Sequence, residues 1–283
     1  MKLGIDIGAS HIGLGLVNKQ NKLIKKKYIP YKRPLKIFNR IFTKYFTNKY
    51  VENLIKEIDL FIDKEKISYI GLGCPGGIDI NNQIFYGSKA LVVGIINFKE
   101  VLSKYKCPIY IDNDCNCAAV CEAYTNNYDN FLMITIGTGV GFALVKKENN
   151  KIYLSKDEKI WKILDINKIP NTKHDKYIMS FKKLSNLYNQ KVKRKKPRDA
   201  IFNDINNNQE LIDNYIDSFV KGINLINEKI PIKNICLGGS FSLYHQYYLN
   251  NLQKKLDNYN IFIAKNNNDS GIIGATHLPI DRY

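Results

Sequence analysis

The chain has 283 residues, of which 45% are hydrophobic and 24% are charged, so it resembles a soluble globular protein with one large domain or two ordinary ones. No apolar stretch approaches the roughly 20 residues of a membrane helix, and Asp6 comes too early for a secretory signal. We therefore expect a cytoplasmic protein. The net charge of +17 would attract an anionic nucleotide or a phosphorylated substrate.

Basic residues gather in two stretches, residues 19–49 and the KVKRKKPR segment at 191–198. Such stretches are compatible with binding to nucleic acid or another anionic surface. The chain is also rich in Lys, Asn, Ile and Tyr throughout, which favours a compositional bias with solvated lysines. We expect neither a nucleic-acid partner nor a membrane partner.

The six cysteines are expected to be reduced and buried, as in a long cytoplasmic chain. Cys115, Cys117 and Cys121 lie close together, but no second ligand pair follows at a typical zinc spacing. Packing of small residues is the favoured interpretation, and a metal or redox role is the alternative.

The first half of the chain alternates strands and helices in the α/β manner. Apolar periodicity and turn residues predict strands at 3–7, 12–16 and 23–29, a helix at 38–61, a strand at 67–73, a turn at 74–79, a strand at 109–111 and a helix at 113–124. One face of the first strand carries only Gly4, Asp6 and Gly8. Because this face is nearly bare of side chains, a ligand could lie against it.

The second half restarts the pattern. It predicts strands at 131–136 and 141–146, a helix at 211–228, strands at 235–237 and 261–264, and a last helix at 270–278. A hairpin that turns through glycines therefore occurs once in each half, as in a duplicated two-lobed architecture. Residues 147–208 are polar, basic and weakly periodic, and no element is assigned to them.

The two hairpins carry the sequences DIGASHIGLGLV, from Asp6, and ITIGTGVGFALV, from Ile134. Glycine lets backbone N–H groups approach an anion, so both turns are predicted phosphate sites. Between them, Asp114 stands where a strand meets a helix, and it could act as a general base in phosphoryl transfer or simply cap the helix. We expect Asp112 to serve in a cap or turn, and Glu122 to brace the site.

Six segments in order resemble the ROK family of bacterial sugar kinases, repressors and open reading frames. They read DIGASHIGLGLV, GLGCPGGID, IDNDCNCAAVCEAY, ITIGTGVGFALV, CLGGSFS and SGIIGATHL. The resemblance implies an α/β, two-lobed, actin-like (ribonuclease H-like) ATPase fold with duplicated mixed β-sheet lobes and a central cleft. It implies an N-terminal lobe at 1–116, rejoined by 270–283, and a C-terminal lobe at 117–269. The GxxxxGK[ST] pattern is absent, which disfavours a P-loop enzyme.

The resemblance also implies roles for individual residues. The first phosphate motif would comprise Asp6, Gly8, Ala9, Ser10 and His11, with Asp6 holding Mg²⁺ through water. The second would comprise Gly137, Thr138, Gly139 and Gly141, and the adenosine side Gly238, Gly239 and Ser240. Asp114 would be the catalytic base, and the sugar contacts would come from Asn113, Gly76 and Asn97.

The implied function is an ATP- and Mg²⁺-dependent kinase of carbohydrate metabolism. It would transfer the γ-phosphoryl group to a hydroxyl of a sugar or sugar derivative. Homodimers are common in the family, so the resemblance also implies a homodimer. The alternative is a non-catalytic nucleotide- or sugar-binding regulatory member. Repressors of the family carry a helix-turn-helix before the first motif, which here begins at the sixth residue, so the repressor class is disfavoured.

The chain departs from the family pattern at three places. Ala9 replaces the usual glycine and His11 the usual lysine, and no cysteine lies between Cys121 and Cys236, so no zinc site is expected. The family's sugar-binding glutamate has no clear counterpart. The candidate replacements are Asp157, Glu158 and Asp175, with His174 expected on the surface.

Overall fold

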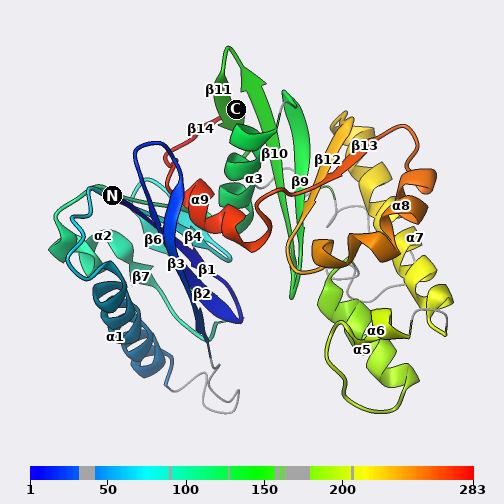
Figure 1. Ribbon diagram of the computed structural model, residues 1–283, viewed down its shortest axis with the longest axis horizontal. Helices are drawn as coiled ribbons and strands as arrows, with labels where there is room; N and C mark the ends of the chain where they lie inside the picture. Colours follow the sequence, from blue (N-terminus) through cyan, green and yellow to red (C-terminus); the bar gives the residue numbers. More distant parts are fainter. Residues whose placement is uncertain are drawn as a thin grey trace. The chain divides into compact units, whose positions relative to one another are not determined.

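The structure, a computed structural model, describes residues 1–31, 42–88, 91–126, 128–156, 160, 163, 179–204 and 207–283. The chain forms two compact units (Figure 1). Unit 1 comprises Met1–Thr125 with Asp269–Ile280, and unit 2 comprises Asn126–Asn268 with Asp281–Tyr283. The expected boundary after residue 116 falls inside helix α3 (Asp114–Thr125), which lies whole in unit 1. Within the described ranges, no helix has both the length and the apolar character to cross a membrane.

Unit 1 is built on a five-stranded mixed sheet in the order β3-β2-β1-β4-β8. Its strands are β1 (Lys2–Ile7), β2 (His11–Val17), β3 (Leu23–Pro30), β4 (Tyr69–Cys74) and β8 (Ile109–Asn113). β1, β2 and β3 pair antiparallel, whereas β1, β4 and β8 run parallel. The sequence predicted all five. It did not predict the small antiparallel sheet of β5 (Ile78–Asp79), β6 (Ile84–Phe85) and β7 (Ile96–Asn97).

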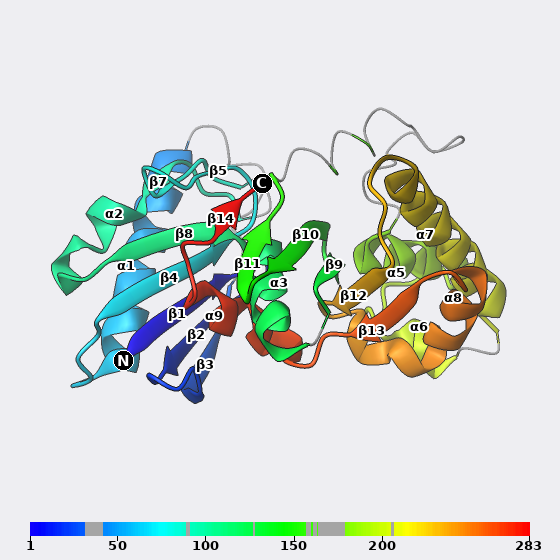
Figure 2. The ribbon, with the colours of Figure 1, turned by 90° about the horizontal axis from the view of Figure 1, so that it is seen from above.

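Helices cover both faces of this sheet (Figure 2). α1 (Thr43–Ile62) buries one apolar stripe on the face that carries Leu3, Ile5 and Ile7 of β1. The opposite face receives α9 (Ser270–Ala275), which also packs along α3. Unit 1 also contains α2 (Phe98–Val101) and η2 (Ser103–Tyr105), whereas the boundary between the units falls within η5 (Asn267–Asp269).

The bare face of β1 that the sequence suggested for a ligand is filled by helix α9. A Cβ at Gly4 would lie 2.1 Å from the carbonyl oxygen of Ile272, and one at Gly71 on β4 would lie 1.8 Å from that of Ala275. Only glycine lets the helix backbone come this close to the strands. The expectation of a ligand along this whole face was therefore wrong, and only its end near Asp6 stays a candidate site.

Unit 2 repeats the strand arrangement of unit 1. Its sheet has the order β13-β12-β9-β10-β11-β14. The strands are β9 (Asn130–Ile136), β10 (Val140–Glu148), β11 (Lys151–Leu154), β12 (Asn234–Gly238), β13 (Asn260–Ile263) and β14 (Asp281–Arg282). As in unit 1, a three-stranded antiparallel meander, here β9 to β11, adds two parallel strands, β12 and β13, on the side of its first strand. This shared order supports the predicted duplication.

The helices of unit 2 enclose its apolar core. They are α5 (Phe181–Lys191), α6 (Ala200–Asn203), α7 (Gln209–Lys229), η4 (Ser242–Tyr247) and α8 (Leu249–Lys255). α7 packs Tyr215, Phe219 and Ile223 against strand residues such as Ile134 and Leu237. β11, α5 and α6 fall in the stretch 147–208, where the sequence pattern assigned nothing. All six cysteines are free thiols, and five of them are buried.

Candidate functional site

Asp6 lies near the end of β1, at the carboxyl edge of the parallel strands. In the sheet register it faces Gly73 of β4, which in turn faces Asp112 of β8. The Asp6 side chain is half-buried, and desolvation together with the negative charge of Asp114 raises its pKa to about 7. Two neighbouring carboxylates in a confined space disfavour ionisation of both, and a bound cation would relieve that repulsion.

The segment that ends β8 and begins α3 positions three consecutive polar residues. Asn113 caps the helix, because its Oδ1 accepts the Cys115 N–H at 3.0 Å. Asp114 is the first helical residue and stays half-buried, with Oδ1 2.9 Å from the same N–H. Asn113 and Asp114 thus both accept this N–H, so the capping contact that the sequence offered as an alternative role for Asp114 is present. The helix N-terminus favours a negative charge at Asp114.

Asp112 lies on β8 and is only 2% exposed, so the expectation of a cap or turn position needs correction. Its Oδ1 accepts the Asn113 N–H at 2.7 Å and the Asn116 amide at 2.9 Å. These bonds brace the β8–α3 junction from inside. Burial, followed by the charges of Asp114, Asp6 and Asp112, raises the pKa of the Cys74 thiol, so the three carboxylates share one neighbourhood.

The first predicted phosphate turn closes tightly at Gly8 to His11. The Gly8 N–H donates to the His11 carbonyl at 2.9 Å, and the Ser10 hydroxyl lies 3.1 Å from His11 Nδ1. Ala9 is half-buried in this turn. The His11 ring stands edge-on to Tyr28, and burial lowers the pKa of His11. A neutral imidazole therefore stands where the resemblance expects a charged lysine.

Helix α9 reaches the site through residues that the sequence did not single out. A Cβ at Gly271 would lie 2.7 Å from the Asp6 Cγ atom. Ser270, beside it, donates to the fully buried Glu122 of α3 at 3.0 Å, which fits the expected bracing role of Glu122. The signal in the sequence was the Ser-Gly pair that opens the last predicted helix. Their role depends on which strand the helix meets.

Lysines of the first basic stretch have partners in unit 1. On β3, Lys25 donates to the Phe61 carbonyl, Lys26 pairs with Asp269 and Lys27 pairs with Glu57. These contacts tie β3 to α1 and to the start of α9. Lys32, Arg33, Lys36 and Arg40 lie outside the described residues.

The predicted sugar contacts lie on different elements of unit 1. Gly76 is exposed in the turn after β4, where its φ of +112° requires glycine. Asn97 ends β7 and caps α2 by accepting the Glu100 N–H at 3.2 Å. The Asn113 Nδ2 atom lies 3.5 Å from the Cys74 carbonyl. The candidate replacements Asp157, Glu158 and Asp175, with His174, lie outside the described residues.

The glycine motifs of unit 2 meet at the ends of the parallel strands β9 and β12. Gly239 has a φ of +80°, and a Cβ there would lie 2.6 Å from the Ile136 carbonyl oxygen. A Cβ at Gly137 would lie 3.6 Å from the Ser240 hydroxyl, so the second phosphate turn and the predicted adenosine segment are adjacent. A Cβ at Gly139 would meet nothing within 4 Å, which leaves room for a ligand beside this turn.

The strand register gives the positions of the other glycines of these motifs. Gly141 faces Thr135 within the β9–β10 pair, and Gly238 faces the same residue from β12. Thr138 accepts a hydrogen bond from Arg198 Nη2 at 3.0 Å. This arginine was missed, because in the sequence it is one of many cations in the second basic stretch.

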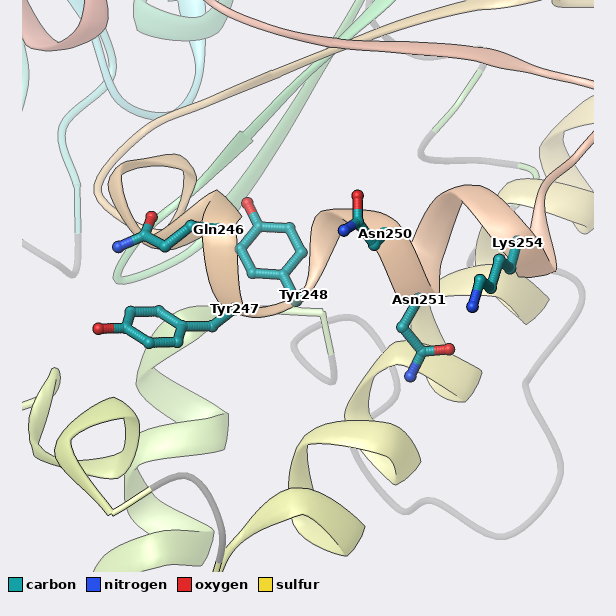
Figure 3. A pocket seen from close by; sticks show the side chains of 6 residues that line it. All are labelled: Gln246, Tyr247, Tyr248, Asn250, Asn251 and Lys254. Atoms are coloured by element: carbon teal, nitrogen blue, oxygen red, sulfur yellow. The ribbon is translucent and has the colours of Figure 1, made fainter.

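A pocket of about 250 Å³ lies elsewhere in unit 2, along η4 and α8 (Figure 3). Its lining consists of Gln246, Tyr247, Tyr248, Asn250, Asn251 and Lys254. None of these is a predicted site residue. The pocket therefore carries no part of the expected chemistry.

The carboxylates of unit 1 suit a hydrated Mg²⁺ ion. Among the residues that the structure describes, no group of three or more His, Cys, Asp or Glu side chains could hold a metal directly. Mg²⁺ usually keeps several waters and takes one or two carboxylates plus substrate phosphates. Asp6, with Asp114 beside it, fits that requirement.

The curated proteins that the sequence matches include a glucokinase and a repressor, each matched over part of its length. The glucokinase of Halalkalibacterium halodurans is 29% identical over 164 residues, which cover 52% of this chain and 44% of that protein. The xylose repressor of Bacillus subtilis is 25% identical over 156 residues, which cover 53% of this chain and 38% of the repressor. The matches thus span less than half of either relative.

The fold is shared with a solved structure. The crystal structure of a ROK family glucokinase from Streptomyces griseus in complex with glucose and AMPPNP matches with a TM-score of 0.72 at 15% identity, covering 98% of both chains. This match confirms the predicted α/β fold of the actin-like ATPase type. The sequence profile of the ROK family matches residues 2–154, which is more than half of the sequence. The chain belongs to the ROK family.

Proposed function

We propose that this protein is an ATP-dependent sugar kinase that phosphorylates a hydroxyl of a sugar or sugar derivative. The single observation that carries the proposal is the pair of carboxylates in unit 1, Asp6 and Asp114. They lie close enough for the charge of one to raise the pKa of the other. Two kinds of relative, a glucokinase by sequence and a glucose- and AMPPNP-bound glucokinase by fold, support it.

In this mechanism each carboxylate has a separate task. Asp114, held at the start of α3, accepts the proton of the attacking hydroxyl as a general base, and the Asn113 amide orients that hydroxyl. Asp6 would hold Mg²⁺ through water, and the ion would supply positive charge to neutralise the phosphate oxygens. Backbone N–H groups of the Gly8–His11 and Gly137–Gly139 turns, with the Thr138 hydroxyl, bind the phosphates.

The test is an acceptor screen with ATP, Mg²⁺ and a panel that includes glucose, mannose and N-acetylglucosamine, read as ADP formation. At least one sugar should stimulate turnover, and Asp114→Asn should lower that gain by about a hundredfold to ten-thousandfold. Asp257→Asn, at an exposed aspartate of unit 2, is the matched control and should behave as wild type. Stimulated turnover that survives Asp114→Asn would contradict the assigned base.

A regulatory, non-catalytic member is the second candidate. The similarity to the xylose repressor of Bacillus subtilis and the neutral His11 in the first phosphate turn favour it. Calorimetry separates the two functions: binding of ATP or a sugar without any sugar-stimulated turnover across the panel would support the regulatory function.

A further inference from the structure

Two cations of the second basic stretch, Lys196 and Arg198, are half-buried, and the side chain of Arg198 bonds to a predicted phosphate turn. Arg194 is exposed, and Lys191 reaches a backbone carbonyl near the start of α7. Arg198 is instead half-buried, and its Nη2 donates to the Thr138 hydroxyl oxygen at 3.0 Å. Thr138 is the central residue of the turn Gly137–Gly139. The stretch thus places the Arg198 cation in hydrogen-bond contact with a predicted phosphate turn.

The chemistry of this contact sets the direction of the Thr138 hydroxyl. A guanidinium group has only donors, so the Thr138 oxygen must accept, and its hydrogen is directed to a different acceptor. The arginine stays charged at all ordinary pH values. Its contact therefore presents Thr138 as a donor and adds a fixed positive charge beside it.

A second element reinforces the positive potential at the turn. The Lys182 N–H, in the first turn of α5, donates to the Gly137 carbonyl at 3.2 Å, so the positive end of this helix lies at the turn. The space beside Gly139 is open on the scale of a Cβ atom. A donor hydroxyl, a guanidinium and a helix N-terminus around an open glycine turn suit an anion with several oxygens.

We propose that Arg198 is a positioning residue for the phosphate chain of the nucleotide, acting through the Thr138 hydroxyl. This inference rests on the proposed function, because it takes ATP as the ligand of unit 2. It assigns a role to one residue of a basic segment for which the sequence offered two interpretations, nucleic-acid binding and a solvated surface. Arg198 thereby distinguishes a nucleoside triphosphate from the bare nucleoside.

The test compares binding of ATP and of adenosine by calorimetry on the full chain. Arg198→Gln should weaken ATP binding by about 10-fold to 100-fold, the range for a charge-assisted hydrogen bond, and change adenosine binding less than about twofold. Arg194→Gln removes the same charge four residues away and should leave both affinities within about twofold of wild type. The control thus removes general electrostatic attraction as an explanation.

A double-variant cycle tests whether Arg198 acts through Thr138. Thr138→Val keeps the shape and removes the hydroxyl, and it should weaken ATP binding on its own. The Arg198→Gln/Thr138→Val pair should lose less affinity than the product of the single losses, because one contact serves both residues. Arg198→Lys keeps the charge without the planar fork and should fall between wild type and Arg198→Gln. It also serves if Arg198→Gln fails to fold.

Three results would overturn the inference. The first is an ATP affinity of Arg198→Gln equal to that of Arg194→Gln. The second is an equal loss of ATP and adenosine binding, which indicates a structural role. The third is independent losses in the double-variant cycle. A wild-type protein that binds no ATP would instead refute the proposed nucleotide site, and this inference with it. ATP binding without sugar kinase activity refutes only the reaction.

Discussion

Replacing Asp6 by Asn should stabilise the protein at alkaline pH and not at acidic pH. Desolvation and the neighbouring Asp114 charge raise the pKa of Asp6 from 3.8 to about 7. Between these two values the folded protein keeps the proton that the unfolded chain has lost. The folded state binds more protons there, so the wild-type free energy of unfolding falls as the pH rises through this window. Because the asparagine of the variant stays neutral, the variant's free energy of unfolding does not fall for this reason.

The magnitude follows from the shift in pKa. At about 1.4 kcal/mol per pKa unit, full ionisation of Asp6 costs at most about 4 kcal/mol, because the half-buried carboxylate keeps some contact with water. Roughly 2–3 kcal/mol of this cost appears between about pH 5 and about pH 8. The stability gain of Asp6→Asn over wild type should therefore grow by that amount across this interval.

The assay is urea denaturation of both proteins at the two pH values, with EDTA present so that no divalent cation binds Asp6. Comparing the two pH values cancels any pH-independent effect of the amide. Asp114→Asn should reduce the pH dependence without abolishing it, because burial is the larger cause. Asp257→Asn should leave it unchanged. A stability difference between Asp6→Asn and wild type that does not vary with pH would refute the reasoning.

Three further substitutions probe the contacts of helix α9 and the buried carboxylate of α3. Gly271→Ala should lower kinase turnover by about 10-fold to 100-fold in steady-state assays. Its Cβ must displace the Asp6 carboxylate by about 0.7 Å, from 2.7 Å to ordinary contact near 3.4 Å, and turnover near wild type would contradict this. Gly71→Ala should cost about 1–3 kcal/mol or more in urea denaturation, because its Cβ would lie 1.8 Å from a carbonyl oxygen of α9. Gly77→Ala, whose Cβ meets only ordinary contacts, is its control, and equal costs would argue against the close packing. Glu122→Leu should destabilise unit 1 by about 1–3 kcal/mol, since it removes the carboxylate that accepts from the buried Ser270 hydroxyl, and a thermal scan that matches wild type would contradict it.

The main strands of both units could be predicted because their pattern is local. Alternating apolar residues that end at glycine turns identify β1, β2, β9 and β10 without knowledge of the rest of the chain. The small sheet β5–β7 was missed because its strands have two residues each, too few for any period to show. α5 was missed because lysine and asparagine interrupt its apolar pattern, and α6 was missed because its 4 residues are too few to show a helical period.

The site divides in the same way. Two glycine turns and Asp114 at the start of a helix can be recognised from residue type and spacing alone. The role of the glycines on β1 and β4 could not, because Gly4 and Gly71 look equally suited to a ligand and to a helix. They accept α9, which begins at Ser270, far later in the chain than either glycine.

By itself, the amino-acid sequence determined the family, the α/β class and the residues at which strands turn through glycine, because each depends on neighbours along the chain. Only the tertiary structure decided which residues from distant segments meet. It placed Gly271 against Asp6 and brought Arg198 into a hydrogen bond with Thr138. Such contacts depend on how distant segments pack against each other, and this packing produces no periodic pattern of residues in the sequence.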